Sequence, residues 1–399
     1  MNEDELNLFL AYGFVIGELR DNKNFNMLKR FKRNEINEDL INKGVNLFLS
    51  LFKEYDTYDK VLVPLSGGLD SRAILIGLLS AGASPENIST FTLGKPGLFD
   101  YEIGKELSKK LNIKNKSINL HNRIFSYKEL LEYAKKFKYP SSFIDGYYNY
   151  LIFKQNEKKY KTLVGYMGDP IAGSHLYLDN NWLDNVLFFD KMHKKSTEID
   201  LFNPTFEPLK ILPTQPLVGE SINYFDQLDF IYRQEYLVHP IVVSNSDIYE
   251  SPFHNLEWLS FFLNAGKNNR KERILFKKIL EVIDYKTFHY KSKEMFGLPG
   301  NSPIYIVNFF KIKRKIMNFL SSSNIINYRD PMLNYLNFGD EIRKGNLKDI
   351  VKISIDSLVS KNILKWIDVS KILEEHLNGT DYSRSLIRLV NLELYLSSR

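Results

Sequence analysis

The sequence predicts an α/β protein with a doubly wound parallel sheet, followed by a mainly helical C-terminal half. From residue 61, short apolar runs alternate with helical stretches, which is typical of consecutive βαβ units. After about residue 185 this alternation ends, and beyond residue 250 apolar residues recur at helical spacing. We therefore expect a helical or mixed lead-in at residues 1–58, an α/β domain at 59–300 and a helical extension at 301–399.

The individual elements are predicted from local runs and their periodicity. Short apolar runs predict strands at residues 61–65, 89–93, 116–120 and 162–165. A helix capped by Asp100 is expected to run through Ile103, Leu107 and Leu111. Helical spacing predicts further helices at residues 71–79, 127–138, 145–155, 256–265, 270–282, 304–319, 347–359 and 383–396. The segment from about 185 to 250 is rich in Asn, Asp and Pro and has weak periodicity.

The composition excludes several classes of protein. The chain of 399 residues contains no cysteine, which excludes disulfides, thiolate metal sites and a cysteine nucleophile. Its N-terminus is acidic and its first apolar stretch is interrupted by Tyr12, Gly13 and Glu18, unlike the basic-then-apolar order of a signal peptide. No apolar run approaches the length that spans a bilayer, so we expect a cytoplasmic protein without a membrane span.

The net charge of +6 arises from 54 basic and 48 acidic residues. Basic clusters at residues 29–33 and 311–315 either suit an anionic partner or form solvated helix faces. We favour the solvated faces, because the excess of positive charge is modest for this length. Nucleic acid is therefore not an expected partner.

One stretch carries a specific chemical signal. The apolar run VLVPL is followed by Ser66, Gly67, Gly68, Leu69, Asp70 and Ser71, and then directly by a helical pattern. We expect the two glycines to let the backbone turn sharply, so that its N–H groups and the helix N-terminus face a phosphate. The loop lacks the lysine of the kinase and GTPase phosphate loop and the spacing of the dinucleotide-binding loop. Asp70 is a candidate Mg²⁺ ligand, and a simple turn with a helix cap is the alternative interpretation.

This hexapeptide resembles the pyrophosphatase loop of the N-type ATP pyrophosphatase superfamily, which includes GMP synthetase, argininosuccinate synthetase, tRNA-lysidine synthetase and asparagine synthetase. The resemblance implies a sheet of the ATP pyrophosphatase type. It also implies that the loop binds ATP, which is cleaved between its α- and β-phosphates, and that Ser66, Gly67, Gly68, Asp70 and Ser71 surround the leaving pyrophosphate.

A second motif narrows the resemblance to one family. Residues 162–170, TLVGYMGDP, place a Gly-rich turn with one carboxylate after a predicted strand. In order and position this segment resembles the GEGxDE-like motif in the synthetase domain of asparagine synthetases. The resemblance implies that Gly165 belongs to the nucleotide site. It also implies that Asp169 binds Mg²⁺ together with Asp70, from two strand ends at one edge of the sheet.

Three further segments match the same family in the same order, namely residues 99–102 (FDYE), 251–253 (SPF) and 293–297 (KEMFG). The last of these resembles the KxxF segment, which implies that Lys293 is the catalytic lysine, with Lys291 as its nearest rival. A fixed ammonium stabilises negative charge that develops on the α-phosphate and the attacked carbonyl. Together the matches cover roughly residues 55–300.

Two departures from the family change the expected chemistry. The chain lacks the cysteine nucleophile and amidotransferase domain of glutamine-dependent asparagine synthetases, so we expect no hydrolysis of glutamine. Tyr166 and Pro170 stand where the second motif has its two glutamates. A tyrosine at this place resembles β-lactam and carbapenam synthetases, in which a Tyr–Glu pair removes a proton from an amine. Tyr166 is therefore a candidate catalytic residue, with packing against adenine or substrate as the alternative.

These features predict an amide ligase that uses ATP and Mg²⁺. A carboxylate of an amino acid, a peptide, a natural-product precursor or a uronic acid sugar would attack the α-phosphorus and release pyrophosphate. Ammonia or an amine would then displace AMP. One alternative is a tRNA-modifying ATP pyrophosphatase, which would need a basic RNA-binding surface. The other is a non-catalytic nucleotide-binding protein of the same fold, which Pro170 and Tyr166 permit.

Overall fold

The computed structural model describes residues 1–35, 39–55, 60–120, 125–156, 160–177, 181–243, 248–322, 325–326, 328–333 and 336–399. Its scaffold is one sheet of five parallel strands, in the order β3 (Lys114–Asn119), β2 (Ile88–Gly94), β1 (Val61–Pro64), β4 (Lys161–Leu163) and β5 (Tyr249–Glu250). Val61 of the central strand pairs with Ile88 on one side and Lys161 on the other. The strand order therefore reverses at β1, and open parallel sheets bind ligands at such reversals, beyond the carboxyl ends of the strands.

The predicted α/β class with a parallel sheet is confirmed, and the four predicted strands lie within two residues of β1 to β4. The two-residue strand β5 was not predicted. The expected boundary between residues 58 and 59 lies outside the described residues.

Helices make up most of the remaining chain. The α-helices are α1 (Glu3–Tyr12), α2 (Lys23–Lys29), α3 (Leu40–Ser50), α4 (Leu69–Ser80), α5 (Phe99–Lys110), α6 (Tyr127–Ala134), α7 (Phe143–Gln155), α8 (Gly168–Ala172), α9 (Trp182–Lys194), α10 (Tyr224–Leu228), α11 (His239–Val243), α12 (Leu256–Ala265), α13 (Lys267–Arg270), α14 (Ile274–Ile283), α15 (Tyr285–Phe288), α16 (Ile304–Ser322), α17 (Phe338–Lys344), α18 (Lys348–Lys361), α19 (Val369–Leu377) and α20 (Ser383–Ser397). A π-helix, η6 (Asp229–Val238), lies between α10 and α11, and the short 3-10 turns are η1 (Leu19–Asp21), η2 (Lys53–Tyr55), η3 (Pro85–Asn87), η5 (Pro208–Ile211) and η7 (Lys271–Arg273).

Most long helices were predicted, and one was predicted wrongly. The helix expected at residues 256–265 is α12, and those expected at 304–319, 347–359 and 383–396 are α16, α18 and α20 with ends that differ by at most three residues. The single helix expected at 270–282 is wrong, because Glu272 and Arg273 have φ values of 53° and 61° and separate α13 from α14. The weakly periodic segment from 185 to 250 contains most of α9 and the whole helical run α10–η6–α11.

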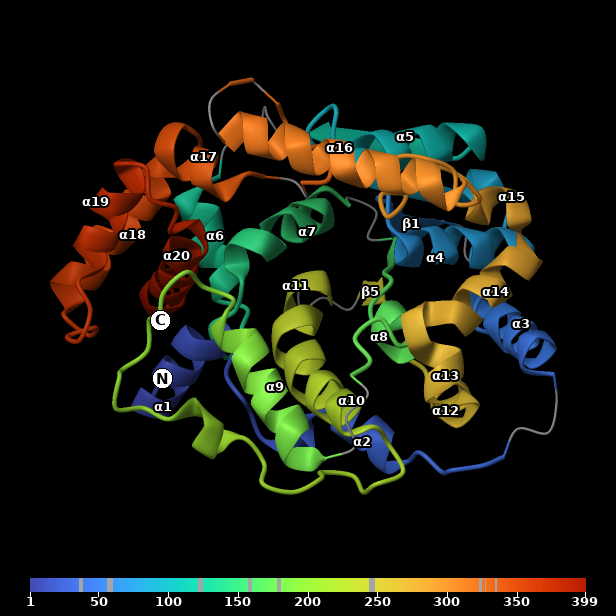
Figure 1. Cartoon of the computed structure of the whole chain (residues 1–399), viewed down its shortest axis with the longest axis horizontal. Helices are drawn as coiled ribbons and strands as arrows, with labels where there is room; N and C mark the ends of the chain where they lie inside the picture. Colours follow the sequence, from blue (N-terminus) through green and yellow to red (C-terminus); the bar gives the residue numbers. More distant parts are fainter. Residues whose placement is uncertain are drawn as a thin grey trace.

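Two hydrophobic cores cover the two faces of the sheet. Val61 and Val63 of β1 point into one core with α3, α4, α12 and α14, whereas Leu62 points into the other with α6, α7, α18 and α20. This alternation along one strand is the reason that both faces of the sheet are buried. Figure 1 shows α17–α20 gathered at one end of the molecule and α12–α15 with α3 at the other.

The first 55 residues pack into both cores. Helix α1 contacts α9 and α20, and α3 contacts α12 and α14. The buried side chain of Asn24 also donates to the carbonyl of Phe230 in η6 at 2.8 Å. The lead-in is therefore part of the same packed body as the sheet.

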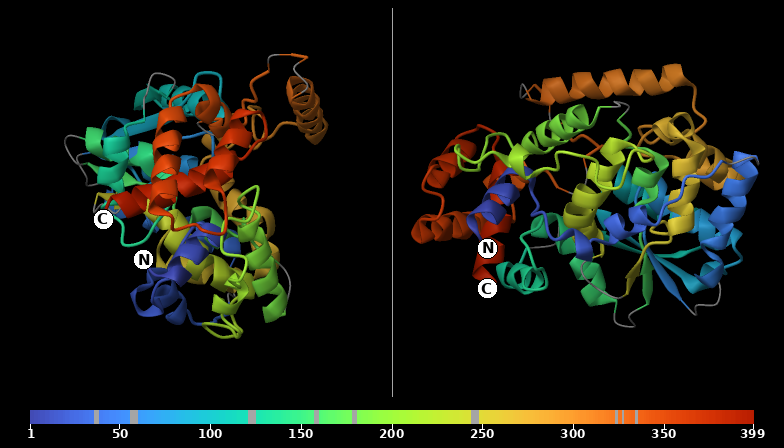
Figure 2. Two further views of the ribbon diagram at one scale, coloured as in Figure 1. Left: turned by 90° about the vertical axis from the view of Figure 1, so that its left-hand side faces the viewer. Right: turned by 90° about the horizontal axis from the view of Figure 1, so that it is seen from below.

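Helix α16 is placed differently from the other long helices. It stands off the body of the molecule, most clearly in the two views of Figure 2, from the side and from below. None of the helices in the described part of the chain is long and apolar enough to cross a bilayer.

Candidate active site

The loop between β1 and α4 lies at the carboxyl end of the central strand. Its hydroxyl groups organise its backbone: the N–H of Ser66 donates to Ser71 Oγ at 3.2 Å, and the N–H of Gly68 donates to Ser66 Oγ at 3.2 Å. Gly68 is the N-terminal cap of α4 and has no side chain to satisfy the first N–H groups of the helix. The positive end of the helix therefore faces the loop, as an anion site requires.

The two glycines of the loop serve a different purpose from the one expected. Neither Gly67 nor Gly68 has a positive φ, so the loop does not depend on a turn that only glycine can make. A Cβ on Gly67 would lie 3.2 Å from the carbonyl oxygen of Phe99 and 3.3 Å from Lys293 Cβ. Gly67 is thus needed for the close approach of α5 and the Lys293 segment to the loop.

Asp100 and Lys293 meet at this loop. The N–H of Gly67 donates to Asp100 Oδ1 at 3.1 Å, and Lys293 Nζ donates to Asp100 Oδ2. The backbone N–H of Lys293 also donates to the carbonyl oxygen of Gly67 at 3.1 Å. The expectation that Asp100 caps a helix is wrong, because Leu98 is the cap residue of α5 and the Asp100 carboxylate reaches across to the loop instead.

The second predicted motif lies beside the first. A Cβ on Gly165 would come within 2.5 Å of Asp70 Cβ, so only glycine allows the two strand ends to approach this closely. Met167 has a φ of 66°, a left-handed conformation that is costly for a side chain of this size. Ser251 supports the turn by donating from Oγ to the carbonyl oxygen of Tyr166 at 2.5 Å.

These contacts bring the carboxylates of Asp70 and Asp169 together. Asp70 is half-buried, but its Oδ1 is shielded from solvent and has no hydrogen-bond partner. Burial, and then the charge and hydrogen bond of Asp169, raise the pKa of Asp70 well above its usual value, while Arg273 opposes the shift. Arg273 donates to Asp169 Oδ1 and to Glu294 Oε1, both at 2.7 Å. Asp70 Oδ1 is therefore a buried carboxylate oxygen without a hydrogen-bond donor to stabilise its negative charge.

The residues present fit a magnesium ion. Carboxylate oxygens are the hard donors that Mg²⁺ prefers, and Mg²⁺ bound with a nucleotide typically uses one or two carboxylates and completes its shell with phosphates and water. In the part of the chain that the structure describes, no cluster of three or more His, Cys, Asp or Glu side chains is placed to hold a metal. The pair Asp70 and Asp169 therefore suits an ion that arrives with phosphate better than a permanently caged one.

Tyr166 is held by its hydroxyl group inside the protein. The hydroxyl donates to the carbonyl oxygen of Gln234 at 3.1 Å and accepts from the Asn24 amide at 2.9 Å. Burial, and then the charge of Glu235, raise the pKa of Tyr166 well above its usual value, so the phenol stays protonated at neutral pH. This arrangement favours the packing alternative for Tyr166 over a role as a proton acceptor.

Two cavities open at the carboxyl edge of the sheet. The first has a volume of about 340 Å³ and is lined by Asp70, Ser71, Asp169 and the η6 residues Arg233 and Gln234, among others. The second has a volume of about 550 Å³, and its lining includes Gly68, Asp100 and Lys293. Both cavities share one ridge, which is formed by Pro64, Ser66 and Asn149. The loop thus separates a cavity with the carboxylate pair from a cavity with the lysine.

Comparison of the sequence with known proteins does not identify this site. No protein-family model matches the chain. No curated protein matches its sequence either.

Several residues of the site were not identified from the sequence. Asn149 of α7 and Arg233 of the π-helix η6 line the cavities. Arg273, at the end of η7, lies behind them and contacts the lining residues Asp169 and Glu294. No local motif marks these residues, because each meets the loops only through tertiary packing. A π-helix is rare and is frequently found at functional sites, but its longer hydrogen-bond spacing leaves no simple periodicity in the sequence.

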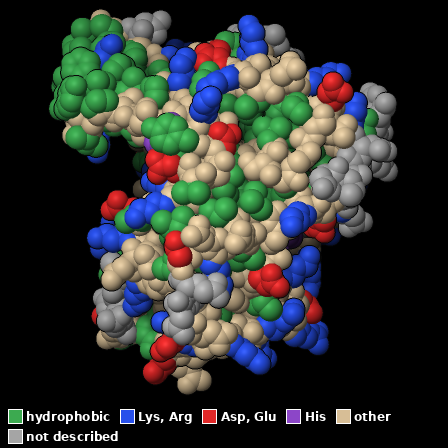
Figure 3. All heavy atoms as spheres, turned by 90° about the vertical axis from the view of Figure 1, so that its right-hand side faces the viewer, with side chains coloured by type: hydrophobic (Ala, Val, Ile, Leu, Met, Phe, Trp, Pro, Cys, Tyr) green, Lys and Arg blue, Asp and Glu red, His purple; other side chains and the backbone are tan. Residues whose placement is uncertain are grey.

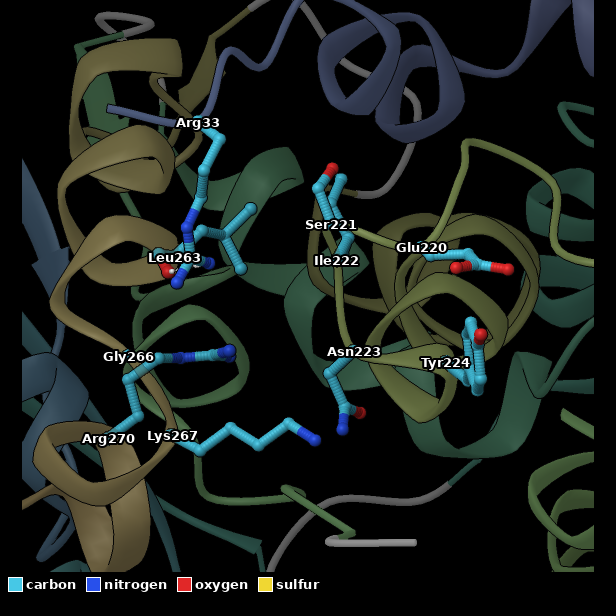
Figure 4. Close-up of a pocket in the computed structure, with 10 residues that line it drawn as sticks. All are labelled: Arg33, Glu220, Ser221, Ile222, Asn223, Tyr224, Leu263, Gly266, Lys267 and Arg270. Carbon is cyan, nitrogen blue, oxygen red and sulfur yellow. Dashed lines mark hydrogen bonds between the residues drawn. The ribbon is translucent and has the colours of Figure 1, made fainter. Parts of the chain in front are cut away.

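A third cavity, of about 460 Å³, lies away from both loops between α10 and α12–α13 (Figure 4). Arg33, Lys267 and Arg270 give it basic character. The Arg270 guanidinium is already engaged, since it donates to Asp226 at 2.5 Å and to the carbonyl oxygen of Ile171 at 2.9 Å. Arg270 therefore fixes helix α8, which carries Asp169, and the cavity beside it contains no residue of either loop.

Proposed function

We propose that this chain is an AMP- and pyrophosphate-forming amide ligase with a sheet of the ATP pyrophosphatase type. It binds ATP at the β1–α4 loop, adenylates a substrate carboxylate and transfers the acyl group to ammonia or an amine. The observation that carries this proposal is the pair of carboxylates Asp70 and Asp169, packed together through Gly165 at the reversal of the strand order, directly beside the Ser- and Gly-rich loop.

The hydrogen bonds that the Asp100 carboxylate accepts support the binding of an anion at the loop. The carboxylate accepts one hydrogen bond from a loop N–H and one from an ammonium, namely Gly67 N and Lys293 Nζ. A phosphate oxygen is satisfied by the same two kinds of donor. An ATP phosphate entering beside Asp100 can thus share or take over these donors, with the N-terminus of α4 adding its partial positive charge.

Asp70 and Asp169 are the residues that would hold Mg²⁺. When bound, this ion neutralises phosphate charge and makes pyrophosphate a better leaving group. The unpartnered Oδ1 of Asp70 would supply one coordinating oxygen, and Arg273, which donates one hydrogen bond to Asp169 and one to Glu294, fixes the orientation of the second carboxylate. A fixed orientation lowers the entropy that is lost when the nucleotide binds.

Lys293 is the proposed catalytic lysine. Its ammonium belongs to the larger cavity next to the loop, where positive charge stabilises the charge that develops on the α-phosphate and the attacked carbonyl. Lys291 is the weaker candidate, because its Nζ pairs with Glu106 at 2.9 Å and its side chain is 46% exposed. Exposure of this degree lets water screen the charge.

The smaller cavity is the proposed site of the carboxylate substrate. Its wall presents the cationic side chain of Arg233, which also contacts Asp229 at 3.3 Å, together with His175 and Gln234. A carboxylate held there would lie next to the phosphate loop, so that its oxygen is oriented toward the α-phosphorus. Amino acids, peptides, natural-product precursors and uronic acid sugars all present such a group.

Exchange of labelled pyrophosphate into ATP tests the proposal. We expect exchange that depends on Mg²⁺ and on one class of carboxylate from a panel of these four classes, with AMP and an amide formed when ammonia or an amine is added. Asp70→Asn and Asp169→Asn should each abolish exchange, because each removes a charge that the metal–phosphate complex needs. Asp349→Asn, at an exposed position of α18, is the matched control and should keep wild-type exchange.

Three results would argue against the proposal. Wild-type exchange in Asp169→Asn would show that the second motif is not part of the active site. Exchange or AMP formation that requires tRNA instead of a small carboxylate would support a tRNA-modifying enzyme. Binding of ATP without its cleavage, across the whole panel, would support a non-catalytic nucleotide-binding protein.

A further inference from the structure

Helix α16 exposes an apolar stripe that the proposed chemistry does not use. Its side chains Tyr305, Phe309, Ile312, Ile316 and Phe319 are between 53% and 72% exposed. Their spacing of four, three, four and three residues places all five on one face of the helix. Figure 3 shows hydrophobic side chains gathered on the projecting part of the molecule at the upper left, where α16 lies. Contiguous apolar patches on soluble chains mark interaction surfaces.

The charges around this stripe all have one sign. Lys311, Lys313 and Lys315 are exposed on α16, and no aspartate or glutamate occurs between residues 295 and 329. At 3.6 residues per turn, Lys313 flanks one side of the stripe and Lys311 and Lys315 flank the other. The remaining cation, Arg314, lies on the inner face and pairs with Asp330 at 2.6 Å. The outer face is therefore apolar along its centre and basic along both edges.

This charge pattern disfavours a second copy of the chain as the occupant. An antiparallel pair of α16 helices centred on Ile312 would bring the same edges together, with Lys313 of one copy beside Lys313 of the other and Lys311 and Lys315 beside their own counterparts. A parallel pair would bring opposite edges together, with Lys313 of one copy beside Lys311 and Lys315 of the other. Like charges at such an interface are destabilising, and α16 offers no acidic residue to compensate them.

We propose that α16 is a peripheral membrane-binding helix that lies in the surface of a bilayer containing anionic phospholipids. Tyr305, Phe309, Ile312, Ile316 and Phe319 enter the boundary between head groups and acyl chains. The lysines at both edges extend their aliphatic stems along the apolar layer and place their ammonium groups among the lipid phosphates. The helix does not cross the bilayer, in agreement with the lack of any spanning helix among the described residues.

Vesicle co-sedimentation of the full chain tests this proposal. We expect binding to vesicles of phosphatidylcholine mixed with phosphatidylglycerol, little binding to phosphatidylcholine alone, and release as the salt concentration rises. The triple change Lys311→Gln, Lys313→Gln, Lys315→Gln should weaken binding to the anionic vesicles by roughly 100-fold, since each lysine near such a surface contributes about fivefold. The double change Phe309→Ser, Ile312→Ser should abolish binding at any salt concentration.

Leu183→Ser is the matched control, because Leu183 is an exposed apolar residue, at 58%, on the unrelated helix α9. It should bind vesicles as the wild type does. Equal binding to neutral and anionic vesicles, or full binding by the Phe309→Ser, Ile312→Ser variant, would overturn the proposal. So would a wild-type dimer in solution that this variant converts to monomers, because that result would assign the stripe to a second copy. Unchanged melting temperatures of the variants exclude unfolding as the cause of lost binding.

Discussion

Gly165→Ala is the sharpest test of the way the two loops form one site. The added Cβ would lie 2.5 Å from Asp70 Cβ, whereas ordinary van der Waals contact begins at 3.4 Å, so the two strand ends must separate by close to 1 Å. Displacing a positioned catalytic group by about 1 Å costs roughly 100-fold in rate. Overpacking of this kind costs about 1–3 kcal/mol of stability, which a chain of this size tolerates. We therefore expect a folded variant with roughly 100-fold slower exchange of pyrophosphate into ATP.

The control for this prediction is Gly44→Ala. A Cβ at Gly44 would lie 2.3 Å from Ile279 Cδ1, in the core between α3 and α14 and away from both loops. This variant should lose stability to a similar degree, seen as a lower melting temperature, and keep wild-type exchange. If Gly165→Ala also kept wild-type exchange, the close packing of Gly165 on Asp70 would have no part in the reaction, and the reasoning from geometry would be refuted.

Three further predictions concern single side chains. Tyr166→Phe should destabilise the protein by about 1–2 kcal/mol, because it removes the hydrogen bonds that the hydroxyl makes with one N–H of the Asn24 amide and with the Gln234 carbonyl, and it should preserve amide formation. A loss of amide product of ~10²-fold or more with unchanged exchange would instead show proton transfer. Lys293→Ala should lower amide formation by roughly 10²–10³-fold, whereas Lys291→Ala should leave amide formation unchanged. The opposite result would assign the catalytic role to Lys291. Burial lowers the pKa of His193 to about 3, so the folded state stays neutral while the unfolded state binds a proton below pH of about 6.5. Between pH 7 and pH 5 this difference removes about 2 kcal/mol of stability, and denaturant titrations should show a smaller drop for His193→Phe than for the wild type.

The parts of the fold that could be predicted are those with a local cause. Strands β1 to β4 are short runs whose side chains are apolar or alternate, and α12, α16, α18 and α20 have regular helical spacing. The position of the β1–α4 loop could be predicted for the same reason, since a strand, two glycines and a helix start follow one another directly. The pattern of one strand and one loop is enough to indicate an anion site.

The parts that could not be predicted depend on contacts between distant segments. Strand β5 has only two residues, and it is a strand because Tyr249 and Glu250 pair with β4. The break at Glu272 and Arg273 lies in a polar run, residues 266–273, just before the apolar periodicity of α14 begins, and nothing in that run marks where the helix starts. Arg273 is held by hydrogen bonds to Asp169 and Glu294, which are about 100 and about 20 residues away in the sequence. The role of the loop glycines was also missed, because a requirement for close approach is visible only when the neighbouring elements are in place.

The ridge of Pro64, Ser66 and Asn149 keeps two compartments distinct while letting them share one wall. Beyond that ridge, residues 65–71 contribute to both linings, whereas η6 and α11 shape only the smaller compartment, and α5 and the Lys293 segment shape only the larger. Substitutions at Arg233 or Val242 can therefore alter the shape and charge of one compartment without moving an atom in the lining of the other. On the proposed function, this division would let the preference for the carboxylate substrate drift during evolution, or be redesigned in the laboratory, while Lys293 on the far side of the ridge stays as it is.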